Sequence, residues 1–469
     1  MLFNSLPFLT SFLLFFSFYC FLSKKWQNVA LLLYGFYFYS YWNWKMSLLL
    51  VISILFNFYI GKFLSQRKKI EDRKRILIFG IVLNLIILGF FKYTLFLVDL
   101  VVDIANVFSH SISIWRPEIL LPVGISFYTF HNISYLVEIA KQNIAPSDNL
   151  VTFSVYDIFF PLLLAGPIER PNSLLPQLES NRKITREGIY KGFSIFLWGI
   201  FLKTAIADPL AKFVDAALNQ SGALPDGILW IVAPSFAFQV YADFSGYSNC
   251  ARGLAYVMGF NLMNNFHRPF FASSPVEFWQ RWHISLSSWL RDYVYIPLGG
   301  NRKGFLRQNI NILLVWILGG LWHGATYGYL LWGIYLGFCI IVYNVIKKYF
   351  LESIPGKFNF TLKMIGIFFT FFSFSFGLLL FRVHNYKELI AYLNNILSIG
   401  TLTSDWFFVF LYFLPILIFD LWQEQIKTSE TDWQLHNKPI VFWLSFSILF
   451  LIFSLISPFA KQEFFYFQF

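Results

Sequence analysis

Residues 76–91 read ILIFGIVLNLIILGFF, and a second run of the same character extends from Met364 to Phe381. Both runs fit helices that cross a hydrocarbon core of about 30 Å. The strands of a transmembrane barrel would alternate polar and apolar residues, whereas Ile312 to Leu318 is wholly apolar and Phe442 to Ile456 is interrupted only by scattered serines. The sequence therefore predicts an all-α polytopic membrane protein.

The composition favours a membrane protein over a soluble one. Hydrophobic residues make up 57% of the 469 residues and charged residues 13%, whereas soluble proteins carry about 25% charged residues. The aromatic content of 22% excludes a disordered or fibrous chain. The net charge of +11 comes from basic residues that lie mostly between apolar runs, so it indicates topology and not nucleic-acid binding. The three cysteines are far apart and form neither a zinc pattern nor a disulfide framework.

The apolar segments predict a series of membrane helices, several of them tilted, broken or re-entrant. We expect them near residues 2–22, 27–41, 46–64, 76–98, 119–140, 152–166, 188–207, 228–260, 308–323, 326–346, 362–382, 405–423 and 440–458. No repeat, linker or soluble domain of useful size is visible. We therefore expect one membrane domain over residues 1–469.

Basic residues in the loops predict the orientation of the chain. The loop from Ser65 to Arg75 carries six Lys and Arg residues between two strong apolar segments, so the positive-inside rule puts it in the cytoplasm. Lys24 and Lys25 agree with this assignment, and counting back places the N-terminus outside. The loop from Asn301 to Asn309 is expected on the cytoplasmic side again.

Polar residues concentrate in the block 234–324, where residues 273–300 read SSPVEFWQRWHISLSSWLRDYVYIPLGG. Ser274 as N-cap, Pro275 at the first helical position and Glu277 as the capping-box residue predict a helix that continues to Leu290. Its aromatic face would hold Trp279, Trp282, His283, Leu286 and Leu290, and its polar face Gln280, Arg281, Ser285, Ser288 and Arg291. Such a helix suits the membrane interface, where its role could be purely structural.

Two further polar residues lie inside apolar stretches. His323 follows Asn309 by fourteen residues, which is about 20 Å of helix at about 1.5 Å per residue. An imidazole at that depth is functional, or else it is hydrogen-bonded to a neighbouring helix. Asp243 must pair with a base or face water, and Arg252 is more than two helical turns away. We expect Asp243 to brace a buried polar network ahead of any direct catalytic role.

Three long motifs carry a family resemblance. Residues 241–270, 277–302 and 319–337 read YADFSGYSNCARGLAYVMGFNLMNNFHRPF, EFWQRWHISLSSWLRDYVYIPLGGNR and GGLWHGATYGYLLWGIYLG. Together they closely resemble the membrane-bound O-acyltransferase family, in particular its bacterial alginate O-acetyltransferase-like branch. The similarity extends to LPVGISFYTFHNISYLVEI, AGPIERP, GIFLKTAIADPLA and GLLLFRVHNYKELIAYL, so it covers most of the chain. Asn249 and His267 depart from the usual family pattern.

The resemblance implies a core of tilted, broken and re-entrant helices around a transmembrane tunnel. It also implies that His283 and His323 are the catalytic pair, with His323 as the base for the attacking hydroxyl. His283 could orient the acceptor, relay the proton or hydrogen-bond the acyl carbonyl. The residues expected to bind substrate are Asp243, Asn265, Trp279, Arg281, Arg291, Asp292 and Trp322. No metal and no permanently bound cofactor are expected.

The implied reaction moves an acetyl group from cytoplasmic acetyl-coenzyme A across the bacterial inner membrane to hydroxyls of an exported polysaccharide, such as an alginate-like polymer or peptidoglycan. An extracytoplasmic SGNH-hydrolase-like acetyltransferase is the expected partner. Arg281, Arg291, Arg302, Lys303 and Arg307 would suit the phosphates of the donor, or they reflect topology alone. The alternatives are D-alanyl transfer to teichoic acid from a carrier-protein thioester, and a transporter that performs no chemistry.

Overall fold

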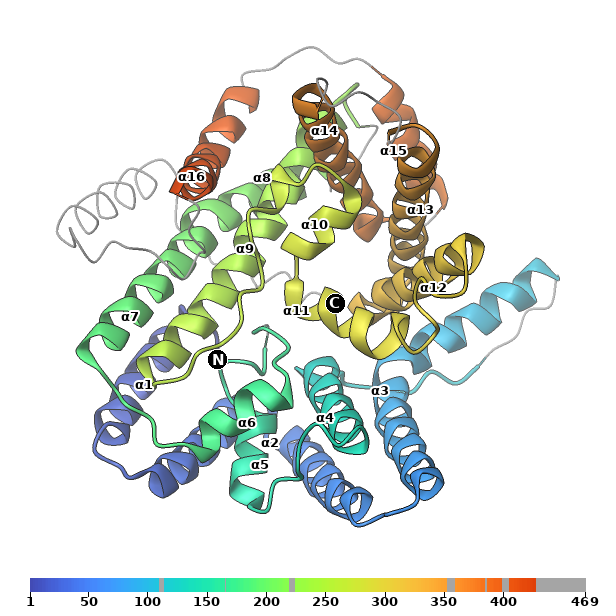
Figure 1. Ribbon diagram of the computed structural model, residues 1–469. Coiled ribbons are helices and arrows are strands. Elements are labelled where there is room, and N and C mark those ends of the chain that lie inside the picture. Colours follow the sequence, from blue (N-terminus) through green and yellow to red (C-terminus); the bar gives the residue numbers. More distant parts are fainter. Residues whose placement is uncertain are drawn as a thin grey trace. The chain divides into compact units, whose positions relative to one another are not determined.

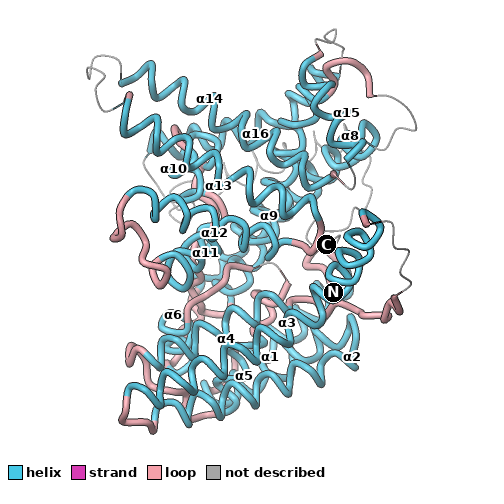
Figure 2. Tube along the Cα trace, turned by 90° about the vertical axis from the view of Figure 1, so that its right-hand side faces the viewer, coloured by secondary structure: helices cyan, strands magenta, loops and turns pink. Residues whose placement is uncertain are grey.

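The computed structural model describes residues 1–108, 114–164, 166–218, 224–351, 359–383, 386–398 and 405–426. Throughout these ranges the chain forms helices joined by loops, and they contain no strand (Figure 1 and Figure 2). The predicted all-α class is confirmed. The chain divides into two compact units: residues 1–196 with 249–263, and residues 197–248 with 264–469. The expectation of a single domain stays a prediction.

Among the described residues, six helical segments are long and apolar enough to cross a membrane. They are Lys24–Ser65, Ile70–Asn106, Arg186–Leu218, Phe305–His323, Tyr327–Tyr349 and Asn359–Arg382. Their apolar windows differ in burial, from 17% for Ile70–Asn106 to 72% for Arg186–Leu218. The chain is a multi-pass membrane protein. The predicted span at 440–458 lies outside the described residues.

Most helices of the first unit come from residues 1–196, and the last of them, Arg186–Phe201, continues into the second unit at Leu197. They are α1 (Leu6–Tyr19), α2 (Lys24–Ser65), α3 (Ile70–Val107), α4 (Ile125–Ala140), α5 (Leu150–Ile158), α6 (Pro171–Glu179) and α7 (Arg186–Phe201). Helix α2 packs against α4 and α5 (Figure 1). The two spans predicted at 27–41 and 46–64 join in α2 across a kink at Asn43, whose backbone is extended (φ −158°, ψ 110°). The kink lies in the gap between the two predicted spans.

Three of the predicted spans are shorter in the structure. Helices α1, α4 and α5 hold 14, 16 and 9 residues, against the expected 2–22, 119–140 and 152–166. Helix α4 begins late because Gly124 precedes it with φ +74°, where a Cβ atom would lie 2.3 Å from the Leu163 carbonyl oxygen. Helix α5 ends at Ile158 because the next residue, Phe159, has a ψ of 105° and leaves the helical region. Backbone geometry therefore sets the start of α4 and the end of α5 inside apolar sequence.

The second unit holds most of the polar block, whose residues 249–263, including the end of the helix Leu229–Val257, belong to the first unit. Its helices are a π-helix (Leu202–Ala207), α8 (Asp208–Leu218), α9 (Leu229–Val257), a 3₁₀-helix (Pro269–Phe271), α10 (Pro275–Arg281), α11 (Ile284–Leu290), a second π-helix (Arg291–Tyr295), α12 (Phe305–His323), α13 (Tyr327–Tyr349), α14 (Asn359–Leu378), a second 3₁₀-helix (Leu379–Arg382), α15 (Tyr386–Leu397) and α16 (Asp405–Ile426). The predicted spans at 308–323, 326–346, 362–382 and 405–423 match α12, α13, α14 with its 3₁₀ extension, and α16.

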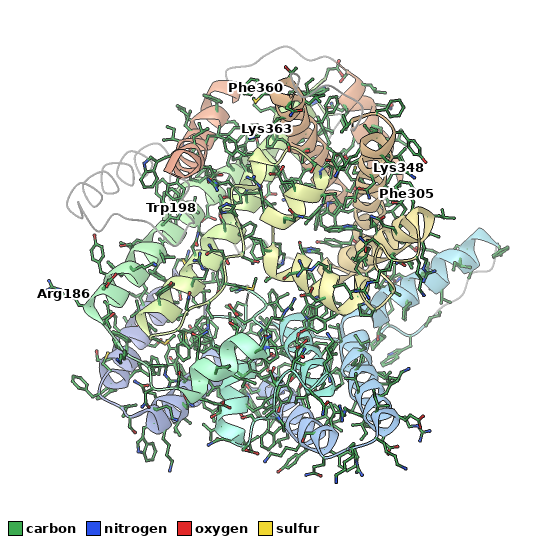
Figure 3. All side chains as sticks on the ribbon, in the orientation of Figure 1. Arg186, Trp198, Phe305, Lys348, Phe360 and Lys363 are labelled. Carbon is green, nitrogen blue, oxygen red and sulfur yellow. The ribbon has the colours of Figure 1, made fainter. Side chains whose placement is uncertain are left out.

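Helices α12 and α13 form a close antiparallel pair that ends at His323. A Cβ atom on Gly320 would lie 2.3 Å from the Tyr329 carbonyl oxygen, and one on Gly333 would lie 2.4 Å from the Trp316 carbonyl oxygen. Small residues let membrane helices approach at this distance. At the other end of the pair, the Lys348 ammonium lies 4.4 Å from the centre of the Phe305 ring (Figure 3). The pair therefore holds the end of α12 close to α13.

Candidate active site

The segment that carries His283 is broken at that residue. The predicted single helix from Ser274 to Leu290 is wrong: α10 ends at Arg281, Trp282 is extended (φ −109°, ψ 130°), and His283 adopts the left-handed conformation (φ 43°, ψ 53°). A non-glycine residue in that region costs about 1–3 kcal/mol and persists only where its surroundings hold it. The continuous aromatic face expected to hold His283, and the polar face expected to hold Arg281, therefore do not exist.

Hydrogen bonds from an earlier segment hold the break in place. The backbone N–H of His267 donates to the Arg281 carbonyl at 2.8 Å, and the N–H of Ile284 donates to the Asn265 carbonyl at 2.9 Å. Residues 265–267 thus satisfy backbone groups on both sides of His283 that a continuous helix would have used. These bonds offset the cost of the left-handed residue.

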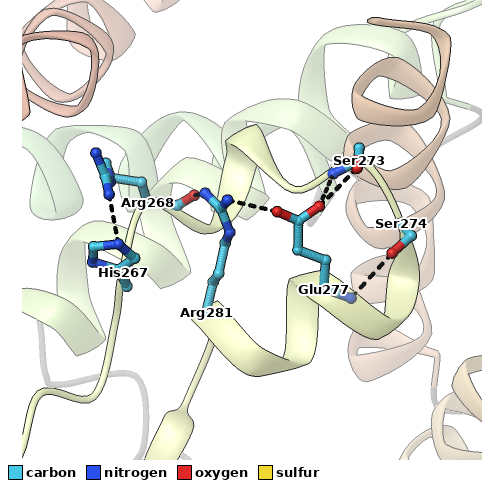
Figure 4. A network of polar contacts seen from close by, with 6 residues as sticks. All are labelled: His267, Arg268, Ser273, Ser274, Glu277 and Arg281. Atoms are coloured by element: carbon cyan, nitrogen blue, oxygen red, sulfur yellow. Dashed lines mark hydrogen bonds and ion pairs between the residues drawn. The ribbon is translucent and has the colours of Figure 1, made fainter. Parts of the chain in front are cut away.

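The start of α10 follows the predicted cap with one difference. The Ser274 hydroxyl accepts from the Glu277 N–H at 3.1 Å, but Glu277 Oε2 accepts from the N–H and hydroxyl of Ser273, both at 2.7 Å (Figure 4). Arg281 donates to Glu277 Oε1 at 2.5 Å and to the Arg268 carbonyl at 3.4 Å. Burial raises the pKa of Glu277, but the Ser273 hydrogen bonds and the Arg281 charge outweigh it and lower that pKa below its ordinary value. Arg281 is thus already engaged within the protein.

His283 is fully buried, and its hydrogen bonds select one tautomer. Its Nδ1 lies 3.3 Å from Asn265 Oδ1 and 3.5 Å from the Ser285 hydroxyl. The Ser285 backbone N–H donates to the same Asn265 Oδ1 at 3.1 Å, which fixes the orientation of the amide. Because a carbonyl oxygen only accepts, the proton of neutral His283 lies on Nδ1 and leaves Nε2 as an acceptor.

The Nε2 atom of His283 has no hydrogen-bond partner among the described residues, although it is buried. Burial and the nearby His323 ring lower the pKa of His283 well below its usual value, so the ring is neutral. A neutral buried acceptor aimed at no protein donor is available to a donor on a substrate.

His323, the second histidine of the expected catalytic pair, lies close to His283, with the two rings inclined at 70°. His323 ends α12, and its ring centre is 6.3 Å from that of His283. The rings of Trp322, Trp332 and Phe381 surround His323 at 4.9, 5.2 and 5.9 Å between centres. The structure thus places two imidazoles, distant in sequence, inside one aromatic enclosure.

Asp243 braces a buried ionic network, as expected, but its partner is a residue that the sequence reasoning missed. Lys203 Nζ lies 2.6 Å from Asp243 Oδ1 and 2.8 Å from Asp208 Oδ1. Lys203 comes from the first π-helix, and Gly246 allows α9 to approach it, because a Cβ atom there would lie 3.1 Å from the Lys203 backbone nitrogen. A lone lysine in the apolar motif GIFLKTAIADPLA is the signal that could have found this partner.

The remaining predicted site residues divide into two groups. Asn265 and Trp322 lie at the histidine pair, the Trp322 ring 5.8 Å from that of His283. Trp279 instead packs against Trp316, with ring centres 4.1 Å apart, while Arg291 pairs with its neighbour Asp292 at 2.8 Å. Substrate binding by these residues stays a prediction.

Aromatic residues that the sequence did not single out also shape the site. Phe244 presents its ring edge to His283 at 4.6 Å between centres, and Trp332 and Phe381 enclose His323. In the part of the chain with described placement, no three His, Cys, Asp or Glu side chains gather as metal ligands would. The site brings together two imidazoles, one of them held as a hydrogen-bond acceptor.

A family model described as the membrane-bound O-acyltransferase family matches residues 36–383. The chain belongs to this family. It is 36% identical over 408 residues to the probable alginate O-acetylase AlgI of Pseudomonas putida, covering 87% of this chain and 81% of the relative. It is 32% identical to the peptidoglycan O-acetyltransferase of Helicobacter pylori over 75% of this chain and 70% of that protein.

A third relative is more distant. The teichoic acid D-alanyltransferase of Bacillus subtilis is 28% identical over 48% of this chain and 60% of its own length. The family resemblance seen in the sequence motifs is thus confirmed, and the protein is an O-acyltransferase. The matched region contains both His283 and His323.

Proposed function

We propose that this O-acyltransferase transfers an acetyl group from acetyl-coenzyme A to hydroxyls of an exported polysaccharide, in the cytoplasmic membrane of a bacterium. The close pair of His283 and His323 carries the proposal, because it places a general base and a hydrogen-bond acceptor with their ring centres 6.3 Å apart. The relatives named for alginate and peptidoglycan O-acetylation cover 87% and 75% of the chain, against 48% for the D-alanyltransferase. This difference favours acetyl over D-alanyl transfer.

The chemistry needs a base more than an acid. The acceptor oxygen attacks the thioester carbonyl, the C–O bond forms and the C–S bond breaks. The thiolate leaves readily because a thiol has a pKa of about 8.5. A neutral His323 takes the proton of the attacking hydroxyl and returns it to the thiolate, so protons and electron pairs balance.

The tautomer of His283 limits what this residue can do in the reaction. With the proton on Nδ1 directed at Asn265, its Nε2 accepts and does not donate. It can therefore orient the acceptor hydroxyl or relay a proton, whereas a hydrogen bond from Nε2 to the acyl carbonyl would need the other tautomer. This tautomer supports two of the three roles that the sequence left open for His283, orienting the acceptor hydroxyl and relaying a proton.

We further propose that delivery to the polymer uses an extracytoplasmic SGNH-hydrolase-like acetyltransferase as partner. The support is the chemistry, because a group that starts on a cytoplasmic thioester must be carried across the membrane to an exported acceptor. Co-purification of such a protein with the membrane enzyme would test this part. Recovery of a fully active enzyme with no partner would contradict it.

The test of the reaction is release of free thiol from acetyl-coenzyme A by purified protein in lipid nanodiscs, with and without a polysaccharide acceptor. We expect His323→Ala to lose about 10²–10⁴ in rate, the usual contribution of general-base catalysis. Thermal unfolding must match wild type, so that misfolding is excluded. Near-native turnover in His323→Ala would contradict the base assignment, and turnover only with a D-alanyl carrier protein would favour the rival donor.

A further inference from the structure

An apolar groove with a basic end lies on the C-terminal half of α2, in the first unit. Its volume is about 470 Å³, and it is lined by Phe56, Tyr59, Ile60, Lys62, Phe63 and Gln66. The ring of Phe79 from α3 lies 6.3 Å from that of Phe56, at the apolar end. From Phe56 to Gln66 the groove follows about 15 Å of helix. This length suits a hydrocarbon chain that lies along the helix.

Two cations are held at the other end of this α2 groove. The Arg67 guanidinium lies 3.8 Å over the ring of Phe63, which lines the groove. Lys62 lies 4.6 Å over the Phe58 ring and donates to the Asp148 carbonyl at 3.3 Å. Cation–π contacts of this kind keep both side chains over aromatic surface. The groove therefore changes from apolar to cationic along its length.

The adjoining segment from the end of α2 to the start of α3 adds to this charge and is itself anchored. Residues 62–75 contain seven basic and two acidic side chains. Arg73 of α3 donates to the carbonyls of Arg67 and Ala140, at 3.1 and 3.4 Å, which ties this segment to the end of the groove. A multivalent basic surface next to a membrane-spanning helix attracts anionic lipid head groups.

The surroundings of the groove are apolar and exposed. The side chains of Leu48, Ile52 and Tyr59 on α2 are 60%, 60% and 62% exposed, and the apolar window of the α3 span is only 17% buried. In a membrane protein these faces contact lipid tails. A groove that is apolar along this face and cationic where the helix ends is complementary to a lipid that carries a negative head group.

We propose that the α2 groove binds an anionic phospholipid, with an acyl chain along Phe56, Tyr59 and Phe63 and the phosphate at Lys62 and Arg67. This site is independent of the proposed acetyl transfer. A free phosphate would use only the basic end and leave the apolar length of the groove unused. The exposed apolar lining therefore favours the lipid.

The experiment compares phosphatidylglycerol with phosphatidylcholine of the same chains, by native mass spectrometry of the purified full chain. The test variant is Lys62→Gln/Arg67→Gln. The matched control is Lys74→Gln/Arg75→Gln, which removes the same charge from exposed positions near the start of α3. We expect the preference for phosphatidylglycerol to fall about thirtyfold in the test variant, as two lost basic contacts near an anionic head group imply. The control should keep most of the preference.

Three results would overturn the proposal: an unchanged preference in the test variant, an equal loss in the control, or full competition by soluble glycerophosphoglycerol. The wild-type protein provides a second measurement that does not depend on how the variants fold. Photo-crosslinking with phosphatidylglycerol that carries a diazirine in its acyl chain should label the peptide that contains residues 56–66. Labelling confined to other peptides would also overturn it.

Discussion

Asn265→Ala tests whether the tautomer of His283 matters for the reaction. In the structure one amide oxygen, Asn265 Oδ1, accepts both from His283 Nδ1 at 3.3 Å and from the Ser285 N–H at 3.1 Å. Truncation removes the acceptor that keeps the proton on Nδ1. The imidazole can then place its proton on Nε2, the atom that must accept from substrate.

The size of the effect follows from these two hydrogen bonds. A neutral hydrogen bond contributes about 0.5–1.5 kcal/mol net, so its loss lowers the fraction of the productive tautomer by up to about tenfold. The Ser285 N–H, buried and without an acceptor, adds about 1–3 kcal/mol of lost stability. We therefore expect kcat about tenfold lower in Asn265→Ala, well short of the loss expected for His323→Ala.

A second variant, Asn265→Asp, distinguishes a role of Asn265 in controlling the protonation of His283 from a purely structural role. Asn265→Asp keeps both acceptor contacts but puts a carboxylate beside His283 Nδ1, which favours the imidazolium and raises the pKa of His283. In wild type that pKa lies well below its usual range. Neutral His283 is lost as pH falls through its pKa, so the acid limb of the kcat profile should move to higher pH in Asn265→Asp.

The assay is thiol release from acetyl-coenzyme A over pH 5–8, with thermal unfolding of each variant as the control for folding. Asn265→Ala with wild-type kcat, together with Asn265→Asp with a wild-type pH profile, would refute the tautomer argument. If both variants lose kcat but the acid limb of the pH profile stays in place in Asn265→Asp, the role of Asn265 is structural only.

Two further predictions concern the framework of the site. Lys203→Met should lower the free energy of unfolding by about 3–5 kcal/mol, because it leaves the buried carboxylates of Asp208 and Asp243 without their cation. Lys203→Met/Asp243→Asn restores the net charge of these three residues and should recover part of that free energy. Equal stability of the two variants would contradict the network. Gly320→Ala should cost about 1–3 kcal/mol and lower turnover, since its Cβ atom would lie 2.3 Å from a carbonyl oxygen of α13. Gly89→Ala in α3, with open space around the new methyl group, should be neutral or stabilising; a similar loss of stability in both glycine variants would show that packing at α12 and α13 is not the cause.

Much of the fold follows from local sequence. The apolar runs predict most of the membrane helices because hydrocarbon cannot satisfy backbone or side-chain polar groups, and this requirement acts on every residue of a span. The gap between the spans at 27–41 and 46–64 coincides with the kink at Asn43. The cap at Ser274 was also predictable from local sequence, because its hydrogen bond joins two residues that are only three positions apart.

The shape of the site depends on partners that are distant along the chain. The periodicity of residues 274–290 is helical throughout, yet the backbone breaks at His283 because Asn265, eighteen residues earlier, accepts the hydrogen bonds around it. Asp243 pairs with Lys203, forty residues earlier in the chain, and Lys203 lies in a π-helix that no sequence pattern predicted. The sequence by itself determined that this chain is a helical membrane O-acyltransferase with two signature histidines. Only the tertiary structure decided their separation, the tautomer of His283 and the partner of Asp243, because hydrogen bonds and ion pairs between distant segments outweigh local helical preference.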